Sequence, residues 1–225
     1  ACVQGSVACC RNDEKAEILM THSLIVYFDY KSPYAFVAKA PIYQLEQDFG
    51  IEVEWRPYSL HIPDFLGTVE VDWEGKIVGG TRNEHQWRRT RYLYMDARRL
   101  AKDTGQDLMI KGPPRVFNSR IAHIGMLFAD REGFFRSYHD LVFDRFWKRE
   151  LDIDDADAVA DVVWEAGGDG AAFKTYISGD GQTDHDRVIE QANEIGIFGV
   201  PSFVLNGELF WGNEHIASVR SRLAE

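Results

Sequence analysis

The sequence predicts an α/β protein in which the two ends of the chain form one domain around a helical insertion. A strand–helix–strand pattern fills residues 23–57, helical periodicity dominates from about 84 to 180, and a helix–strand–strand–helix pattern ends the chain. We therefore expect residues 21–60 and 181–225 to form one domain, and residues 61–180 to form a mostly helical inserted domain.

The first unit begins with the apolar run "SLIVYFDY" at residues 23–30, which has the length and composition of a strand. Ser32 and the proline after it predict a helix start, because serine is a good N-cap and proline is tolerated at the first helical position. The helix is predicted to end at Gly50, and Pro41 inside it predicts a kink or a local break. Alternation over residues 51–58 predicts the second strand.

The rest of the chain has clear turn signals. Alternation around Glu74-Gly75 predicts a small hairpin or an extended loop, and four to five helices are expected from Glu84 to Asp180. Residues 184–196 predict another helix, followed by two strands joined at Asn206-Gly207, a strong two-residue hairpin signal. A closing helix is expected over residues 213–225.

Composition excludes several classes of function. The chain of 225 residues is 45% hydrophobic and carries a net charge of -11. Nucleic acid is not expected as a partner, because phosphate binding needs a positive face. No apolar run approaches the roughly 18 residues that span a membrane. The basic stretch Arg82–Arg99 could bind a small anion, or could be a solvated helix face.

The three cysteines, Cys2, Cys9 and Cys10, all precede the first strand. Met20 resembles a natural start, so we expect residues 1–20 to be an upstream extension or an expression remnant outside the fold. The folded part then contains no cysteine, which excludes a disulfide framework within it.

A helical domain inserted between the halves of a thioredoxin fold resembles the DsbA-like superfamily. In its redox members a Cys-x-x-Cys motif lies at the N-terminus of the first helix. The sequence "SPYA" puts Ser32 and Ala35 at those two positions. Disulfide exchange needs a thiolate, so redox chemistry is excluded at this site.

Serine followed by "PY", together with "FGVPSFVLNGELFWGNEHI" at residues 198–216 and "FNSRIAHIG", resembles a narrower branch. This branch contains the 2-hydroxychromene-2-carboxylate isomerases and the kappa-class glutathione transferases. The resemblance runs from about residue 23 to the C-terminus. It implies that glutathione is the cofactor and that Ser32 is the catalytic residue that holds its thiolate.

Helix-terminus electrostatics supports this role for Ser32. A helix N-terminus carries about half a positive charge and unpaired N–H groups, which favour an anion. A free thiol with a pKa near 8.5 is mostly protonated at pH 7, and a lowering by about two units would make the thiolate the main species. The alternative is that Ser32 is only an N-cap.

The resemblance implies two further contacts with glutathione. A cis peptide at Val200-Pro201 would expose the Val200 backbone to the cysteinyl part; the alternative is a trans proline at a strand start.

The corner of Trp211, Gly212, Asn213 and Glu214 would receive the γ-glutamyl group. Asn213 could instead be only an N-cap. Glu214 replaces the usual aspartate of the family and is one methylene longer.

The resemblance also places Tyr34, Asn83 and Phe117 near an aromatic or carboxylate substrate, and Arg88 or Arg91 could bind its carboxylate. We expect an isomerase in which the thiolate adds reversibly to an unsaturated carbon. The alternatives are a kappa-like transferase, which leaves glutathione on the product, and a redox-inactive module that binds a partner along Val200.

The remaining expectations concern surroundings and metals. A cytoplasmic enzyme is expected because reduced glutathione is abundant there, and the resemblance implies a homodimer. No metal site is expected: the acidic run 152–161 lacks the glycine and distal glutamate of a calcium loop, and the histidines show no paired ligand spacing.

Overall fold

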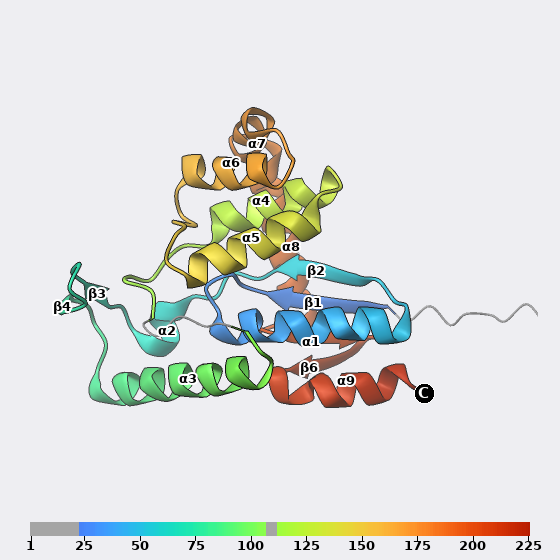
Figure 1. Cartoon of the computed structure of the whole chain (residues 1–225), viewed down its shortest axis with the longest axis horizontal. Helices are drawn as coiled ribbons and strands as arrows, with labels where there is room; N and C mark the ends of the chain where they lie inside the picture. Colours follow the sequence, from blue (N-terminus) through green and yellow to red (C-terminus); the bar gives the residue numbers. More distant parts are fainter. Residues whose placement is uncertain (1–22, 107–111) are drawn as a thin grey trace, which may run out of the picture.

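A mixed sheet with the strand order β2-β1-β5-β6 lies at the centre of the protein (Figure 1). The fold is that of a computed structural model, which describes residues 23–106 and 112–225; the predicted extension 1–20 lies outside them. The strands are β1 (Leu24–Phe28), β2 (Val53–Pro57), β5 (Ser202–Leu205) and β6 (Glu208–Trp211). β1 pairs in parallel with β2 and antiparallel with β5, so strands from before and after the long helical segment meet in the middle of the sheet.

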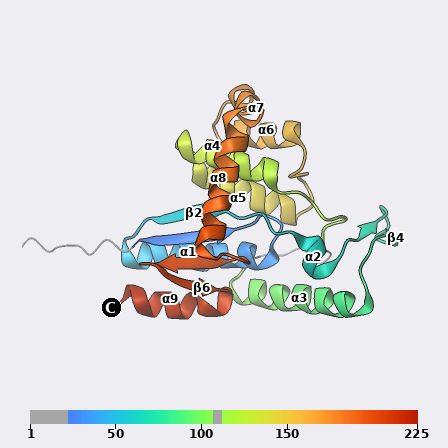
Figure 2. The ribbon, with the colours of Figure 1, turned by 180° about the vertical axis from the view of Figure 1, so that it is seen from behind.

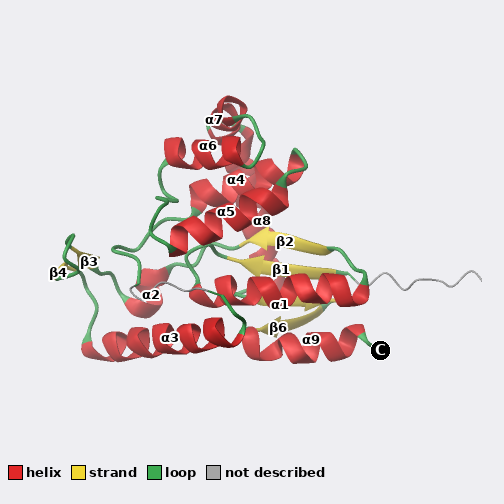
Figure 3. Cartoon of the chain, in the orientation of Figure 1, coloured by secondary structure: helices red, strands yellow, loops and turns green. Residues whose placement is uncertain are grey.

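Helices cover both faces of this sheet (Figures 1–3). Those on the side of the first helix are α1 (Pro33–Phe49), α3 (Glu84–Asp103) and α9 (Ile216–Leu223). Helix α8 (Asp180–Ile195) crosses the opposite face, as the view from behind shows (Figure 2). The others, α4 (Arg120–Arg131), α5 (Phe135–Trp147), α6 (Ala156–Glu165) and α7 (Gly170–Ile177), pack together beyond β2. The segment between the two halves is therefore divided: α3 lies beside α1, whereas α4–α7 pack with one another and against α8.

Helix α1 has the predicted ends but no break. Ser32 is its N-cap, and Gly50 ends it with a left-handed φ of 61°. Pro41 lacks the N–H that would pair with the carbonyl of Val37, yet the helix continues through it. The side-chain amide of Gln106 donates to the Val37 carbonyl at 2.9 Å and so replaces the hydrogen bond that Pro41 cannot make.

The two hairpins agree with the sequence. Asn206 (φ 50°) and Gly207 (φ 87°) both have positive φ, as a two-residue type I′ turn requires. The hairpin around Glu74-Gly75 is formed by β3 (Glu70–Val71) and β4 (Ile77–Gly79).

Two features differ from expectation. A five-residue helix, α2 (Ile62–Leu66), follows β2 and is too short to produce a periodic signal. The closing helix does not begin at Asn213: one 3-10 turn, η1 (Asn213–His215), precedes α9.

An aromatic cluster packs the C-terminal end of β1 against α5. The Phe28 ring lies 4.6 Å from the ring of His139 and 5.0 Å from that of Tyr30, and the Tyr30 hydroxyl is 3.2 Å from His139 Nδ1. Tyr30, His139 and Phe143 are fully buried. This packing holds the end of β1, from which the chain turns into α1.

Removing the Gln106 amide should destabilise the protein. Gln106→Ala leaves the buried Val37 carbonyl without a donor, which costs about 1–3 kcal/mol. In a Pro41→Ala background the helix supplies its own N–H to Val37, so Gln106→Ala should cost at most a few tenths of a kcal/mol there. Urea unfolding of the four proteins measures both values, and an equal cost in both backgrounds would show that the amide does not substitute for the missing helical bond.

Candidate functional site

The site is built on the turn between β1 and α1. The Ser32 amide donates to the Asp29 carbonyl at 2.9 Å, and this bond closes the turn. The Ser32 side chain is almost fully buried and its Oγ accepts from the Ala35 amide at 3.3 Å. Ser32 is thus an N-cap, but a hydroxyl that accepts still has its own proton to donate. That proton lies at the positive end of α1, where an anion is favoured.

The loop before β5 contains a cis peptide and a residue, Val200, whose backbone groups form no backbone hydrogen bonds with the described residues. The Val200-Pro201 peptide is cis, as the resemblance implied. Val200 is buried, and within residues 23–106 and 112–225 no backbone hydrogen bond reaches its N–H or its carbonyl. The Ser202 hydroxyl donates to the Gly199 carbonyl at 2.7 Å and holds the loop closed. Val200 therefore presents two backbone groups to an extended ligand.

The corner after β6 is tied to both of these segments. The Gly212 amide donates to the Pro201 carbonyl at 2.9 Å, and the Asn213 Nδ2 donates to the Tyr34 carbonyl at 3.0 Å. Gly212 has a φ of 102°, which favours glycine. Asn213 does not cap the last helix; its amide joins the corner to the first turn of α1 instead. The structure thus brings Ser32 and the corner together.

Two side chains in the corner, Asn213 and Glu214, can accept further hydrogen bonds. Asn213 Oδ1 is buried without a hydrogen-bond partner in the described structure. Glu214 next to it is exposed, and its carboxylate lies close enough to Tyr34 to contribute to a raised pKa of that phenol. Trp211 is half exposed and its ring lies 4.9 Å from that of Phe198. The corner therefore offers acceptors for a cationic group beside an aromatic surface.

The three residues expected near substrate lie in different places. The Tyr34 hydroxyl donates to Asp96 Oδ2 at 3.0 Å, and burial, together with that carboxylate, raises the pKa of Tyr34 well above its usual value. Asn83 is the N-cap of α3 and forms a reciprocal capping box with Gln86. Along the helix it lies roughly 20 Å from Asp96, so it is not adjacent to the Ser32 turn. Its predicted contact with substrate stays a prediction.

The two arginines suggested for a substrate carboxylate lie on the exposed side of α3. Arg88 pairs with Glu84 at 3.4 Å, and Arg91 is exposed. Neither has a contact with the Ser32 turn in the described structure.

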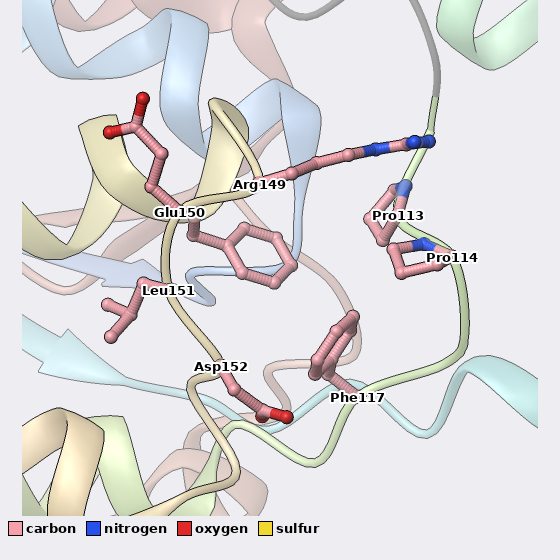
Figure 4. A pocket seen from close by; sticks show the side chains of 8 residues that line it. Pro113, Pro114, Phe117, Arg149, Glu150, Leu151 and Asp152 are labelled. Carbon is pink, nitrogen blue, oxygen red and sulfur yellow. The ribbon is translucent and has the colours of Figure 1, made fainter. Parts of the chain in front are cut away.

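Phe117 lines a hollow between the loop before α4 and the end of α5 (Figure 4). The hollow has a volume of about 280 Å³. The rings of Phe117 and Phe146 meet edge to face at 5.4 Å, and the Arg115 guanidinium stacks on Phe117 at 4.0 Å. Ser32 does not line the hollow, but Ser119, two residues after Phe117, accepts a hydrogen bond from Lys31 Nζ at 2.9 Å.

A buried polar network next to Ser32 was missed from the sequence. Lys31 Nζ lies 3.0 Å from Asp29 Oδ2, and the Leu60 amide donates to the same oxygen at 2.8 Å. His123 Nε2 is 3.4 Å from Asp29 Oδ1. Burial opposes ionisation of Asp29, but Lys31, His123 and the Leu60 amide together hold its pKa well below its usual value. The only trace in the sequence is that Asp29 and Lys31 interrupt an aromatic run directly before Ser32.

The network continues through the interior to α8. Ser59 Oγ is 3.1 Å from His123 Nδ1 and 3.3 Å from His185 Nε2, and the two imidazole rings stack at 5.8 Å. Burial lowers the pKa of His123, and burial with the nearby His123 and Arg120 lowers the pKa of His185 to about 3. No group of three or more His, Cys, Asp or Glu side chains in the described ranges is arranged to hold a metal ion.

Comparison with known proteins places the chain in a family. The DSBA-like thioredoxin domain family matches residues 23–224. The chain belongs to this family. A relative from Pseudomonas putida named 2-hydroxychromene-2-carboxylate isomerase is 28% identical over 88% of this chain and 92% of its own length. These matches confirm the resemblance carried by the two end motifs.

Solved structures of similar proteins have the same fold. A 2-hydroxychromene-2-carboxylate isomerase, 26% identical, superposes with a TM-score of 0.70 over 89% of this chain and 94% of its own. A probable DsbA oxidoreductase from Streptomyces coelicolor, 16% identical, also reaches a TM-score of 0.70 over 90% of each chain, which shows the shared fold alone. None of the described helices in this DSBA-like domain is long and apolar enough to cross a bilayer.

Acid should destabilise this DSBA-like domain before its carboxylates titrate. The pKa of His185 is lowered to about 3 and that of His123 is also lowered, whereas an unfolded histidine titrates near about 6.5. Below about pH 6.5 the unfolded chain therefore binds more protons than the folded one, and stability falls with pH. Asp29, whose pKa is also lowered, adds a further loss only below about pH 4.

Urea unfolding should show that the free energy of unfolding falls by about 2 kcal/mol or more between pH 7 and pH 5. His185→Gln should make this slope shallower, whereas His85→Gln, at an exposed position, should leave it unchanged. An identical slope in wild type and His185→Gln would contradict the assignment.

Proposed function

We propose that this protein is a glutathione-dependent isomerase that acts on a small unsaturated aromatic carboxylate. The observation that carries the proposal is the convergence of three separate segments at the N-terminus of α1: the Ser32 turn, the Val200-Pro201 loop and the corner 211–214. No described residue is a cysteine, and in this proposal bound glutathione supplies the sulfur. The relatives and the solved structure named isomerase support the same class of reaction.

The polar groups of the site fit the parts of a glutathione molecule. The N–H and carbonyl of Val200, to which the described residues make no backbone hydrogen bond, suit an extended peptide unit, as a strand edge does. The N–H groups at the start of α1 suit an anion, and Asn213 Oδ1 and the Glu214 carboxylate suit the γ-glutamyl ammonium. A buried acceptor without a partner costs free energy, and a bound donor would remove that cost.

Ser32 acts on the thiol in this proposal. Its Oγ already accepts from the Ala35 amide, so its proton is the group left to donate. A hydrogen bond from this hydroxyl to a thiolate, together with the end of the helix, lowers the pKa of the thiol. Bound glutathione supplies a sulfur nucleophile that adds to and leaves an unsaturated carbon, so it is neither consumed nor oxidised.

The proposed substrate site is the hollow lined by Phe117. The hollow is lined by the rings of Phe117, Phe146 and the Pro113-Pro114 segment, which suit a planar aromatic group, and charged side chains also line it (Figure 4). The link from this hollow to the Ser32 turn is the hydrogen bond between Lys31 and Ser119. A cytoplasmic location and a homodimer remain part of the proposal; reduced glutathione is available in the cytosol.

Titration with glutathione by calorimetry tests the proposal directly. Binding in the millimolar range or tighter, and retained affinity for the S-methyl form, are expected. Incubation with a cis unsaturated aromatic ketoacid should then yield the trans isomer with glutathione recovered unchanged. A covalent glutathione product would indicate a transferase instead, and absence of binding up to about 10 mM would leave only a partner-binding module.

Ser32→Ala should lower turnover by more than the loss of a helix cap alone would explain. Loss of a cap costs about 0.5–2 kcal/mol of stability. Loss of a charge-assisted hydrogen bond worth roughly 1.5–3 kcal/mol lowers the rate about ten- to a hundredfold. The pKa of the bound thiol, measured by thiolate absorbance, should rise in parallel.

Asp155→Ala is the matched control, because Asp155 caps α6 in the bundle beyond β2 and its loss removes a cap elsewhere. It should lower stability by a similar amount and leave turnover unchanged. Unchanged turnover and thiol pKa in Ser32→Ala would show that Ser32 is only a cap.

A further inference from the structure

A buried ion pair lies within the turn that presents Ser32. The side chains of Lys31 and Asp29 are 7% and 0% exposed, and their charged atoms are 3.0 Å apart. Each charge is also hydrogen-bonded: the carboxylate accepts from the amides of Lys31 (3.2 Å) and Leu60 (2.8 Å), and the ammonium donates to Ser119 Oγ (2.9 Å). Apolar residues of similar volume often stabilise a protein as well as a buried pair does. Stability alone therefore does not account for the pair.

Both charges are placed to act on whatever binds at Ser32. The Asp29 carbonyl accepts from the Ser32 amide, and Lys31 is the residue before Ser32. Charges in a buried turn are weakly screened, so each acts strongly on a neighbouring ionisable group. A carboxylate alone at this place would oppose an anion at Ser32, and an ammonium alone would favour it.

We propose that Lys31 and Asp29 are a charge-balanced pair of positioning residues: Asp29 holds the turn that carries Ser32, and Lys31 cancels the negative charge that this requires. Because the two charges cancel, the pair does not oppose the binding of an anion at the N-terminus of α1. The identity of that anion as a thiolate of glutathione rests on the proposed function; the electrostatic effect on position 32 does not.

Within the part of the chain that the structure describes, Lys31 and His123 are the basic side chains paired with Asp29. His123 also faces Asp29, at 3.4 Å, but burial lowers its pKa, so it is neutral at pH 7. Other titratable groups near the turn include Tyr30, Tyr34, Asp96 on α3, His139 on α5, His185 on α8 and Glu214 in η1. Lys39, which is paired with Asp140, lies further along α1. The imidazoles of His139 and His185 are not cations at pH 7, because burial lowers the pKa of both.

A thiol introduced at position 32 measures the effect without glutathione. The parent protein carries Ser32→Cys together with serine in place of Cys2, Cys9 and Cys10, so that it has a single thiol. Its pKa is read from thiolate absorbance as pH is varied. Lys31→Met should raise this pKa by about one unit or more, and Asp29→Asn should lower it by a similar amount. The double variant should return to within about half a unit of the parent.

The expected pKa shifts of the thiol have opposite signs in Lys31→Met and Asp29→Asn, and this distinguishes an electrostatic role from a structural one. A turn that merely loosens moves the thiol away from the end of the helix, so both single variants would raise the pKa. Lys39→Met is the matched control: Lys39 is also buried and paired with a carboxylate, Asp140 at 2.8 Å, but lies further along α1. It should leave the pKa of the thiol unchanged.

Each result has a defined meaning. Shifts of the same sign in both single variants, or an equal shift in Lys39→Met, would overturn the proposal. If Lys31→Met does not fold, as circular dichroism would show, Asp29→Asn decides alone, and an unchanged or raised pKa refutes the pair. If wild type binds no glutathione while the single-thiol series behaves as expected, the proposed function fails and this inference stands.

Discussion

The full burial of the Asp29 carboxylate is the constraint on which the site depends. A buried carboxylate is tolerated only when its oxygens are hydrogen-bonded and its charge is balanced. The amides of Lys31 and Leu60 and the ammonium of Lys31 meet that need, and the ammonium in turn requires Ser119. The β1–α1 turn, the β2–α2 connection and the start of α4 must therefore lie at fixed distances from one another. Ser32 is held at the end of α1 as a consequence of this arrangement.

Hydrogen bonds to backbone carbonyls connect the corner after β6 to the first turn of α1 and to the proline loop. The Asn213 amide donates to the Tyr34 carbonyl, and the Gly212 amide donates to the Pro201 carbonyl. The acceptors in both contacts are main-chain carbonyls, whose positions depend on the course of the backbone. The corner and the proline loop are thus aligned with the helix end before any ligand binds. This preorganisation reduces the entropy that a flexible peptide ligand would otherwise have to overcome in ordering the protein.

The helical segments between the two halves contact the site from two directions. Helix α3 reaches it through Asp96, which accepts from the Tyr34 hydroxyl, and α4 reaches it through Ser119 and His123. Gln106, just after α3, also replaces the hydrogen bond that Pro41 removes from α1. The first helix of the thioredoxin fold is therefore stabilised by parts of the chain that are far away in sequence. Ser32 therefore lies where these two sets of helices meet.

The sequence alone determined the order of the elements, the end of α1 at Gly50, the hairpin at Asn206-Gly207 and the place of Ser32 as an N-cap. These depend on local rules: strand and helix periodicity, capping, and the positive φ that a tight turn requires. The matching motifs at the two ends further indicated the family and the cis peptide at Val200-Pro201. Only the tertiary structure decided that α3 separates from the other helices, that Asn213 binds Tyr34 instead of capping α9, and that Asp29, Lys31 and His123 form one network. The reason is that such contacts join residues many positions apart, and no local pattern encodes which distant partner a buried polar group will find.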